Sequence, residues 1–194
     1  VCPFAHVSLH RLVDDRARAG AEDVVIRVRA WPLELVNGEP TEADHAASEI
    51  DDLRAQVAGD LFTGFERSAF PVGSIRALGL SVAAYDVGPE VGEAVSLAVR
   101  DALFEHGRPI GDPEVLAAVA AEHGVDLPEE EESRRRVEAD LAEGRARQVE
   151  GSPHFFVGGA SFFCPALDIE DQGDHLRISV EHQRNEDFLR RAFG

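Results

Sequence analysis

The sequence predicts an α/β fold in which a large all-helical block separates strand-forming segments. Residues 23–35 alternate in a strand-like pattern, residues 41–149 carry only helical patterns, and two short aromatic runs between 153 and 163 flank a Gly-Gly pair. A chain of 194 residues is long enough for one core that carries a sizeable insertion. We therefore expect residues 1–40 and 150–194 to form one domain and residues 41–149 to form a helical insertion.

The first elements are a helix and a strand. Apolar residues recur at near-helical spacing from Pro3 to about Ala19, Pro3 suits the first helical turn, and Gly20 is a suitable stop. Asp23–Leu35 is rich in β-branched residues and is predicted to be a strand whose pairing ends at Pro32.

The next hundred residues show helix starts and helical periodicity but no strand pattern. The predicted starts are Thr41 with Asp44, Pro89, Asp112 with Pro113, and Pro128. The apolar periodicity that follows these starts indicates helices through Val57, through Phe104, beyond Val119 and through Leu141.

The last part of the chain is predicted to be a hairpin followed by a helix. Gly158-Gly159 lies between the short runs 153–157 and 160–163, which indicates a two-residue hairpin turn. That turn would place Pro153 opposite Cys164. Ile178–Phe193 is predicted to be the closing helix.

Composition argues against several classes of partner. Lys+Arg number 19 and Asp+Glu 37, so the net charge of −18 repels phosphate backbones and anionic lipid, and we expect neither nucleic acid nor membrane as a partner. The sequence shows no run of 18 apolar residues and no signal-peptide pattern, which favours a cytoplasmic location. Two cysteines, far apart in sequence, do not indicate a disulfide scaffold.

The candidate reactive group is Cys2, directly before Pro3 at a helix start. Unpaired N–H groups and the helix dipole stabilise a thiolate there, and the thiolate is the reactive form. His6 lies one turn further along the same face, where a protonated ring would favour the anion. The alternative is a buried, inert cysteine, which is common.

A second local feature supports the reactive interpretation. Pro153 follows Gly151-Ser152 and enters an apolar strand, where a proline cannot donate to the ladder. A cis bond at Pro153 would expose the carbonyl and N–H of Ser152 to a substrate chain. Cys-Pro at a helix start, together with this proline, is the two-part signature of the thioredoxin fold.

Three segments carry a resemblance to a known family: Val1–His6, the stretch 102–116 (ALFEHGRPIGDPEVL) and the stretch 151–159 (GSPHFFVGG). The chain resembles the DsbA-like branch of the thioredoxin superfamily, specifically the FrnE-like dithiol-disulfide isomerases of the cytoplasm. Mycothiol-dependent nitroreductase relatives are similar too, in an aromatic pair before a proline (Phe162, Phe163, Pro165). The resemblance implies a thioredoxin-like fold of DsbA type with a helical insertion.

This sequence departs from the family pattern at two points. The second active-site position holds Ala5 in place of a cysteine, so Cys2 cannot form an intrahelical disulfide. Cys164 is the candidate second thiol, although a packed, unpaired cysteine is the favoured interpretation. The family also has a central strand before the first helix. We expect that strand upstream of Val1, because its absence would leave ladder groups unpaired on both neighbours.

The preferred function is that of a thiol-disulfide oxidoreductase or isomerase acting through one cysteine. Cys2, Pro153 and His6 are the candidate catalytic residues. The candidate substrate-binding residues are Pro3, Phe4, Ala5, Ser152, His154 and Trp31. One alternative is a glutathione- or mycothiol-binding enzyme of the 2-hydroxychromene-2-carboxylate isomerase or kappa-class transferase type. The other is a degenerate, non-catalytic binding module.

The expected partner is a thiol or disulfide substrate, either a protein or a small molecule. We expect no tightly bound cofactor, with glutathione or mycothiol as a candidate co-substrate, and leave a homodimer open. No metal is expected, since a zinc cluster of Cys2, His6 and His154 lacks further ligands at fixed spacing. The other histidines, His10 among them, show no partner pattern.

Overall fold

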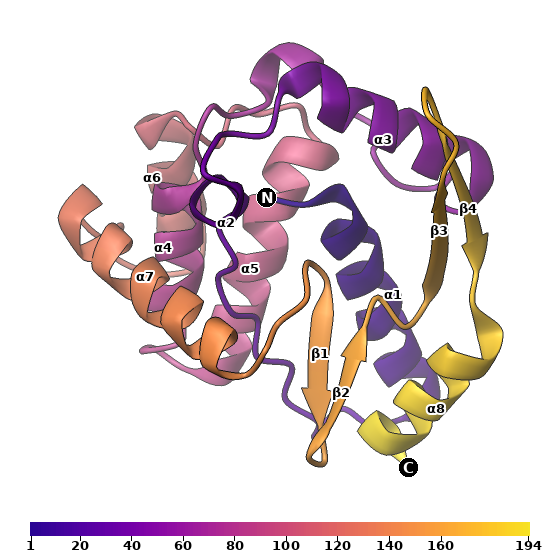
Figure 1. Ribbon diagram of the computed structural model, residues 1–194. Coiled ribbons are helices and arrows are strands. Elements are labelled where there is room, and N and C mark those ends of the chain that lie inside the picture. The colour runs from indigo at the N-terminus through magenta and orange to yellow at the C-terminus, as the bar shows by residue number, and fades with distance from the viewer.

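The computed structural model describes residues 1–194 and combines helices with two separate antiparallel hairpins (Figure 1). The helices are α1 (Pro3–Ala19), α2 (Leu33–Asn37), α3 (Ala43–Gln56), the short 3₁₀ helix η1 (Arg67–Ala69), α4 (Ile75–Ala84), α5 (Pro89–Phe104), α6 (Pro113–Glu122), α7 (Glu130–Ala146) and α8 (His182–Phe193). The strands are β1 (His154–Val157), β2 (Ala160–Phe163), β3 (Leu167–Asp171) and β4 (Leu176–Val180).

Helix α1 confirms the first predicted element. Cys2 is its extended N-cap residue and Pro3 lies in its first turn, where a missing N–H costs nothing. Gly20 ends the helix with φ of 66°, a left-handed conformation that glycine adopts without steric cost. The helix therefore presents Cys2 at its amino end.

The predicted strand at Asp23–Leu35 is wrong. Residues 23–32 have no strand partner, and Leu33 already begins helix α2. Side chains supply some of the hydrogen bonds of this backbone. The Tyr85 hydroxyl accepts from the N–H of Val28 and donates to the carbonyl of Ile26, and Asp140 accepts from the N–H of Ala30. β-branched residues favour an extended backbone, but a strand also needs a neighbouring ladder.

The block after residue 41 is helical as expected, with two differences in detail. Glu42, rather than Thr41, precedes α3, and it makes no capping bond. Asp112 does cap α6, accepting a bond from the N–H of Glu114. Helix α4 was not predicted. None of its residues is exposed, and it packs against α5 and α7.

The carboxyl-terminal part contains one hairpin more than predicted. Strands β1 and β2 pair around Gly158-Gly159 as expected, and the N–H of Cys164 donates to the carbonyl of Pro153 at 3.0 Å. The prediction of a helix from Ile178 is wrong, because Ile178 pairs with Ile169 in the β3–β4 hairpin and α8 begins at His182. Helix α3 meets this hairpin through Gln56, which accepts from the N–H of Ile178.

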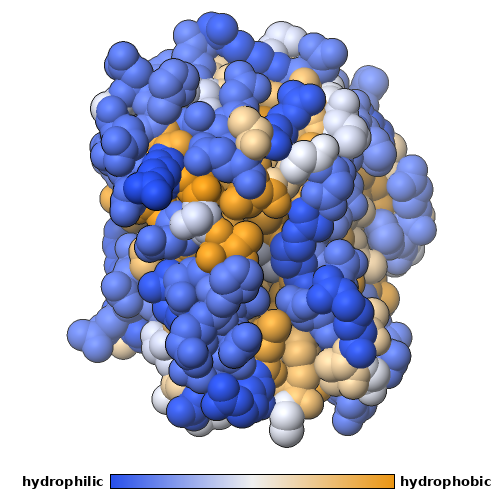
Figure 2. Space-filling view, turned by 90° about the vertical axis from the view of Figure 1, so that its right-hand side faces the viewer, coloured by the Kyte–Doolittle hydropathy of each residue, from blue (hydrophilic) through white to orange (hydrophobic).

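The main hydrophobic core joins residues from α1, α3, α4, α5, α6 and the β3–β4 hairpin. Figure 1 shows α4, α6 and α7 to one side of α5 and α1 to the other, with the β3–β4 hairpin beyond α1. The face in Figure 2 is mostly hydrophilic, with apolar side chains exposed at its middle and lower edge. Helix α3, in the expected insertion, packs against α1 and β4, which belong to the expected thioredoxin-like domain. The division of the chain into two domains at residues 40 and 150 stays a prediction. No helix is long and apolar enough to cross a bilayer.

Candidate active site

Cys2 and the proline loop lie in contact. The Cys2 thiol donates a hydrogen bond to the carbonyl of Ser152, with 3.2 Å between sulfur and oxygen. Ser152 precedes Pro153 through a cis peptide bond. Cys2 is half-buried and Pro153 is buried. The structure thus brings together the two parts of the predicted signature, although 150 residues separate them in the chain.

The expected low pKa of Cys2 is wrong for the protein as folded. Burial raises the pKa of the Cys2 thiol above its ordinary value, because the charged thiolate loses solvation. The N–H of Ala5 in the first helical turn lowers the same pKa, and the bond to Ser152 does so less strongly, but burial outweighs both. The sequence shows the helix start but not the degree of burial around the sulfur.

His6 does not tune the thiol as expected. Its ring points toward α5, where Nε2 lies 2.7 Å from Oε1 of Glu105. The ring is fully buried against Phe62 and Phe104. Burial lowers the pKa of His6 to about 4, despite the bond to Glu105, which raises it. His6 is therefore uncharged at neutral pH, and no hydrogen bond joins its ring to the Cys2 thiol.

His154 also turns away from the sulfur. Nδ1 accepts from the N–H of Glu150, Nε2 lies 2.6 Å from Oγ of Ser161, and the ring stacks on Phe156. Both nitrogens are occupied by these neighbours. The structure therefore does not gather Cys2, His6 and His154 into the zinc cluster considered from the sequence.

Cys164 is the second thiol near this loop. It is buried, unpaired, and tied to Pro153 by its backbone N–H. Burial, with a smaller contribution from the neighbouring Cys2, raises the pKa of Cys164 to about 11. Both cysteines are free thiols in the structure, and Cys164 is packed in the hydrophobic core.

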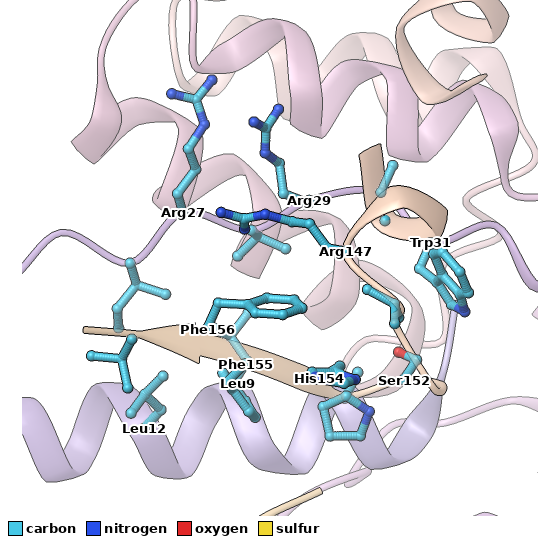
Figure 3. A pocket seen from close by; sticks show the side chains of 18 of the residues that line it. Leu9, Leu12, Arg27, Arg29, Trp31, Arg147, Ser152, His154, Phe155 and Phe156 are labelled. Carbon is cyan, nitrogen blue, oxygen red and sulfur yellow. The ribbon is translucent and has the colours of Figure 1, made fainter. Parts of the chain in front are cut away.

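A cavity of about 460 Å³ opens beside the loop, between residues 24–31 and strand β1. Figure 3 shows Arg27, Arg29 and Arg147 on one side of it, with Phe156 of β1 facing them and α1 below. Ala5 and Trp31 line the cavity, whereas Phe4 lies in the core. Trp31 packs so closely that a side chain at Gly144 would come within 2.6 Å of its ring.

Unpaired backbone groups face this cavity from both sides. Residues 26, 28 and 30 bond to Tyr85 and Asp140, whereas the backbone groups of Val25, Arg27 and Arg29 have no hydrogen-bond partner. In an antiparallel pair, every second residue of a strand bonds to the neighbouring strand through its backbone. In β1 the residues that bond toward β2 are 155 and 157, in register with the bond at Pro153, so the N–H and C=O groups of residues 154 and 156 point away from β2. Two extended segments that line the cavity therefore each carry backbone groups without a hydrogen-bond partner.

Sequence reasoning missed two groups near this site. His10 was set aside, yet its Nε2 lies 2.7 Å from Oδ1 of Asp101. Arg100, buried in α5, lines the cavity and donates to the carbonyl of Ser96. The spacing of His6 and His10, and of Asp101 and Glu105, places each pair on one helix face. That spacing alone does not reveal that α1 and α5 face each other.

Comparison with known proteins gives a family but no individual relative. A search of curated proteins and a search of solved structures each gave no match. The family model described as the DSBA-like thioredoxin domain matches residues 1–177. This match covers α1 with Cys2, the helical block, the β1–β2 hairpin and β3, and it ends within β4. The chain therefore belongs to the DSBA-like thioredoxin domain family, whose members are of the thiol-disulfide oxidoreductase and isomerase type.

Proposed function

We propose that the protein catalyses thiol-disulfide exchange through Cys2 alone. The observation that carries the proposal is the contact between the Cys2 sulfur and the carbonyl of Ser152 in the proline loop. Cys2 loses its proton to solvent, and the thiolate attacks one sulfur of a substrate disulfide. A Cys2 mixed disulfide forms and the other sulfur leaves as a thiolate. A second thiolate then attacks the substrate sulfur of the mixed disulfide and releases Cys2 as a thiolate. If that thiolate belongs to the substrate, the net result is an isomerisation; if it is a small thiol, the small thiol ends in the new disulfide.

The surroundings of Cys2 set the pH range of this exchange. Since burial raises the pKa of the thiol, only a small fraction is ionised at neutral pH. The thiolate that does form is a strong nucleophile, because nucleophilicity rises with thiol pKa. A partner chain whose N–H bonded the carbonyl of Ser152 would compete with the Cys2 thiol for that oxygen. Docking of the partner and release of the sulfur are thereby linked.

The test is intact-protein mass spectrometry after incubation with glutathione disulfide at several pH values. We expect one glutathione adduct in the wild type and in Cys164→Ser, and none in Cys2→Ser. The initial rate should rise about tenfold per pH unit from pH 6 to pH 8, where the pH lies well below the pKa of the thiol. An adduct that survives in Cys2→Ser, or a rate that levels off below pH 8, would contradict the proposal.

A second candidate is a glutathione- or mycothiol-binding isomerase or transferase. The observation that favours it is that the Cys2 thiol is a hydrogen-bond donor at rest rather than a thiolate. S-methylglutathione separates the candidates, because it has no thiol or disulfide with which to exchange. Calorimetric binding of this probe, without a mixed disulfide in the glutathione disulfide experiment, would favour the second candidate. Exchange at Cys2 without binding of the probe would favour the first.

A further inference from the structure

Two pairs of ionisable side chains face each other between α1 and α5. His6 and His10 are four residues apart on α1. Asp101 lies on α5, and Glu105, four residues later, is the C-cap residue of that helix, so each pair lies on one side of its helix. His6 Nε2 lies 2.7 Å from Glu105, and His10 Nε2 lies 2.7 Å from Asp101. The two imidazole rings are 4.5 Å apart between centroids. These four side chains form one cluster, which does not include Cys2.

Three of these side chains lie close enough together to converge on one metal ion. One potential ligand atom from each of His6, His10 and Asp101 lies within 4.8 Å of the other two. Zinc takes nitrogen and oxygen ligands at about 2.0–2.2 Å, so tetrahedral ligand atoms lie about 3.4 Å apart. Side chains must therefore rotate to bring the ligand atoms from these separations to the shorter distances of a zinc site. His10 and Asp101 are partly exposed and therefore free to rotate.

A second observation concerns His6 itself. Its ring is fully buried, yet Nδ1 has no hydrogen-bond partner. Buried polar atoms in proteins nearly always have a partner, and an unexplained one calls for a water or an ion. Glu105 bonds the other nitrogen of the ring and is itself held by the N–H groups of Phe62 and Thr63. A carboxylate behind an imidazole is the usual arrangement around histidines that bind metals.

We propose that His6, His10 and Asp101 bind a zinc-like divalent transition-metal ion between α1 and α5. Two imidazoles and one carboxylate suit zinc, whereas magnesium and calcium prefer all-oxygen sites. Asp101 and the adjacent Glu105 together supply the two negative charges that balance the ion. The partly exposed side chains of His10 and Asp101 give the ion a route from solvent and leave a fourth position for water.

The test uses Co²⁺ as a visible probe in a Cys2→Ser/Cys164→Ser background, so that no thiol competes. Four-coordinate Co²⁺ should give visible absorption bands, which an equivalent of Zn²⁺ should abolish. His10→Gln and Asp101→Asn should each weaken Co²⁺ binding at least tenfold. The matched control is His45→Gln on α3, which removes an exposed histidine from its i,i+4 pair with Glu49 and should bind Co²⁺ as the background does.

A thermal melt distinguishes loss of the site from loss of the fold. His10→Gln and Asp101→Asn should melt cooperatively in chelator, and added Zn²⁺ should raise the midpoint of the background protein but not of these variants. Two results would overturn the proposal. One is a background protein that binds no Co²⁺, and the other is equal Co²⁺ affinity in the background and in either folded variant. Neither Co²⁺ absorption nor the thermal melt depends on thiol exchange at Cys2. Failure of the metal proposal can therefore be told apart from failure of the proposed function.

Discussion

Glu105 should be a major single contributor to stability, because one carboxylate serves several donors. It accepts from the His6 ring at 2.7 Å, from the N–H of Phe62 at 2.7 Å, and from both the N–H and the hydroxyl of Thr63 at 3.0 Å. Glu105→Ala leaves all of these without their acceptor. Thr63 is exposed and can turn to water, but His6 and Phe62 are fully buried.

The magnitude follows from the buried donors. Each buried donor left without a partner costs about 1–3 kcal/mol, so two cost about 2–6 kcal/mol, and partial relaxation brings the expectation to about 3 kcal/mol. For a chain of this length, that corresponds to a fall of about 6–12 °C in the melting temperature. Urea unfolding followed by circular dichroism, in chelator so that no metal contributes, measures the free energy directly.

A surface glutamate provides the control for this experiment. Glu122, exposed in the last turn of α6, makes no hydrogen bond through its side chain, and Glu122→Ala should change the free energy of unfolding by less than about 0.5 kcal/mol. The reasoning is refuted if Glu105→Ala is no more destabilising than Glu122→Ala. In that case the donors find other partners, and Glu105 does not tie α5 to α1 and to the loop at 62–63.

Three other measurements address other parts of the fold. Arg11 holds the pKa of Asp60 at about 2, so this exposed pair stabilises the fold above pH 4 by about 0.5 kcal/mol, and the difference between wild type and Arg11→Gln should vanish as pH falls toward 2. Gly79→Ala should cost about 2–3 kcal/mol in urea unfolding, with only partial rescue by Ser133→Gly, because the new methyl meets the side chain and the Cα of Ser133. In hydrogen exchange, the amides of Val28 and Ala30 should exchange more slowly than those of residues 25, 27 and 29. Equal exchange rates for the amides of residues 25–30 would contradict the hydrogen bonds to Val28 and Ala30. An unchanged free energy of unfolding in Gly79→Ala would contradict its close packing on Ser133, and a stability difference between wild type and Arg11→Gln that does not depend on pH would contradict the Arg11–Asp60 pair.

Local patterns predicted the elements that carry the site. Cys2 before Pro3 identified the start of α1, and Gly158-Gly159 fixed the register that joins Cys164 to Pro153. Both inferences rest on neighbouring residues whose backbone preferences are strong. The position of the sulfur against the Ser152 carbonyl follows once the helix start and the hairpin are packed together.

Features that depend on distant contacts could not be predicted in this way. The raised pKa of Cys2 comes from burial by several elements, which a single segment does not reveal. The partners of His6 and His10 lie on α5, about ninety residues away in sequence. At Asp23–Leu35 the sequence predicted a strand that the structure does not have. The β-branched residues there indicate an extended backbone but not whether another strand lies beside it.

The open backbone edges beside the cavity also bear on how the protein behaves at high concentration. Unpaired edges are templates on which a second chain can add, and proteins commonly guard them with charge. Here Arg27, Arg29 and Arg147 stand over the opening, while the molecule as a whole carries a charge of −18. Repulsion between copies reaches only about 10 Å in 0.1 M salt and shortens as salt is added. Ionic strength should therefore control colloidal stability, with dilute buffer keeping the molecules apart and concentrated salt bringing them together.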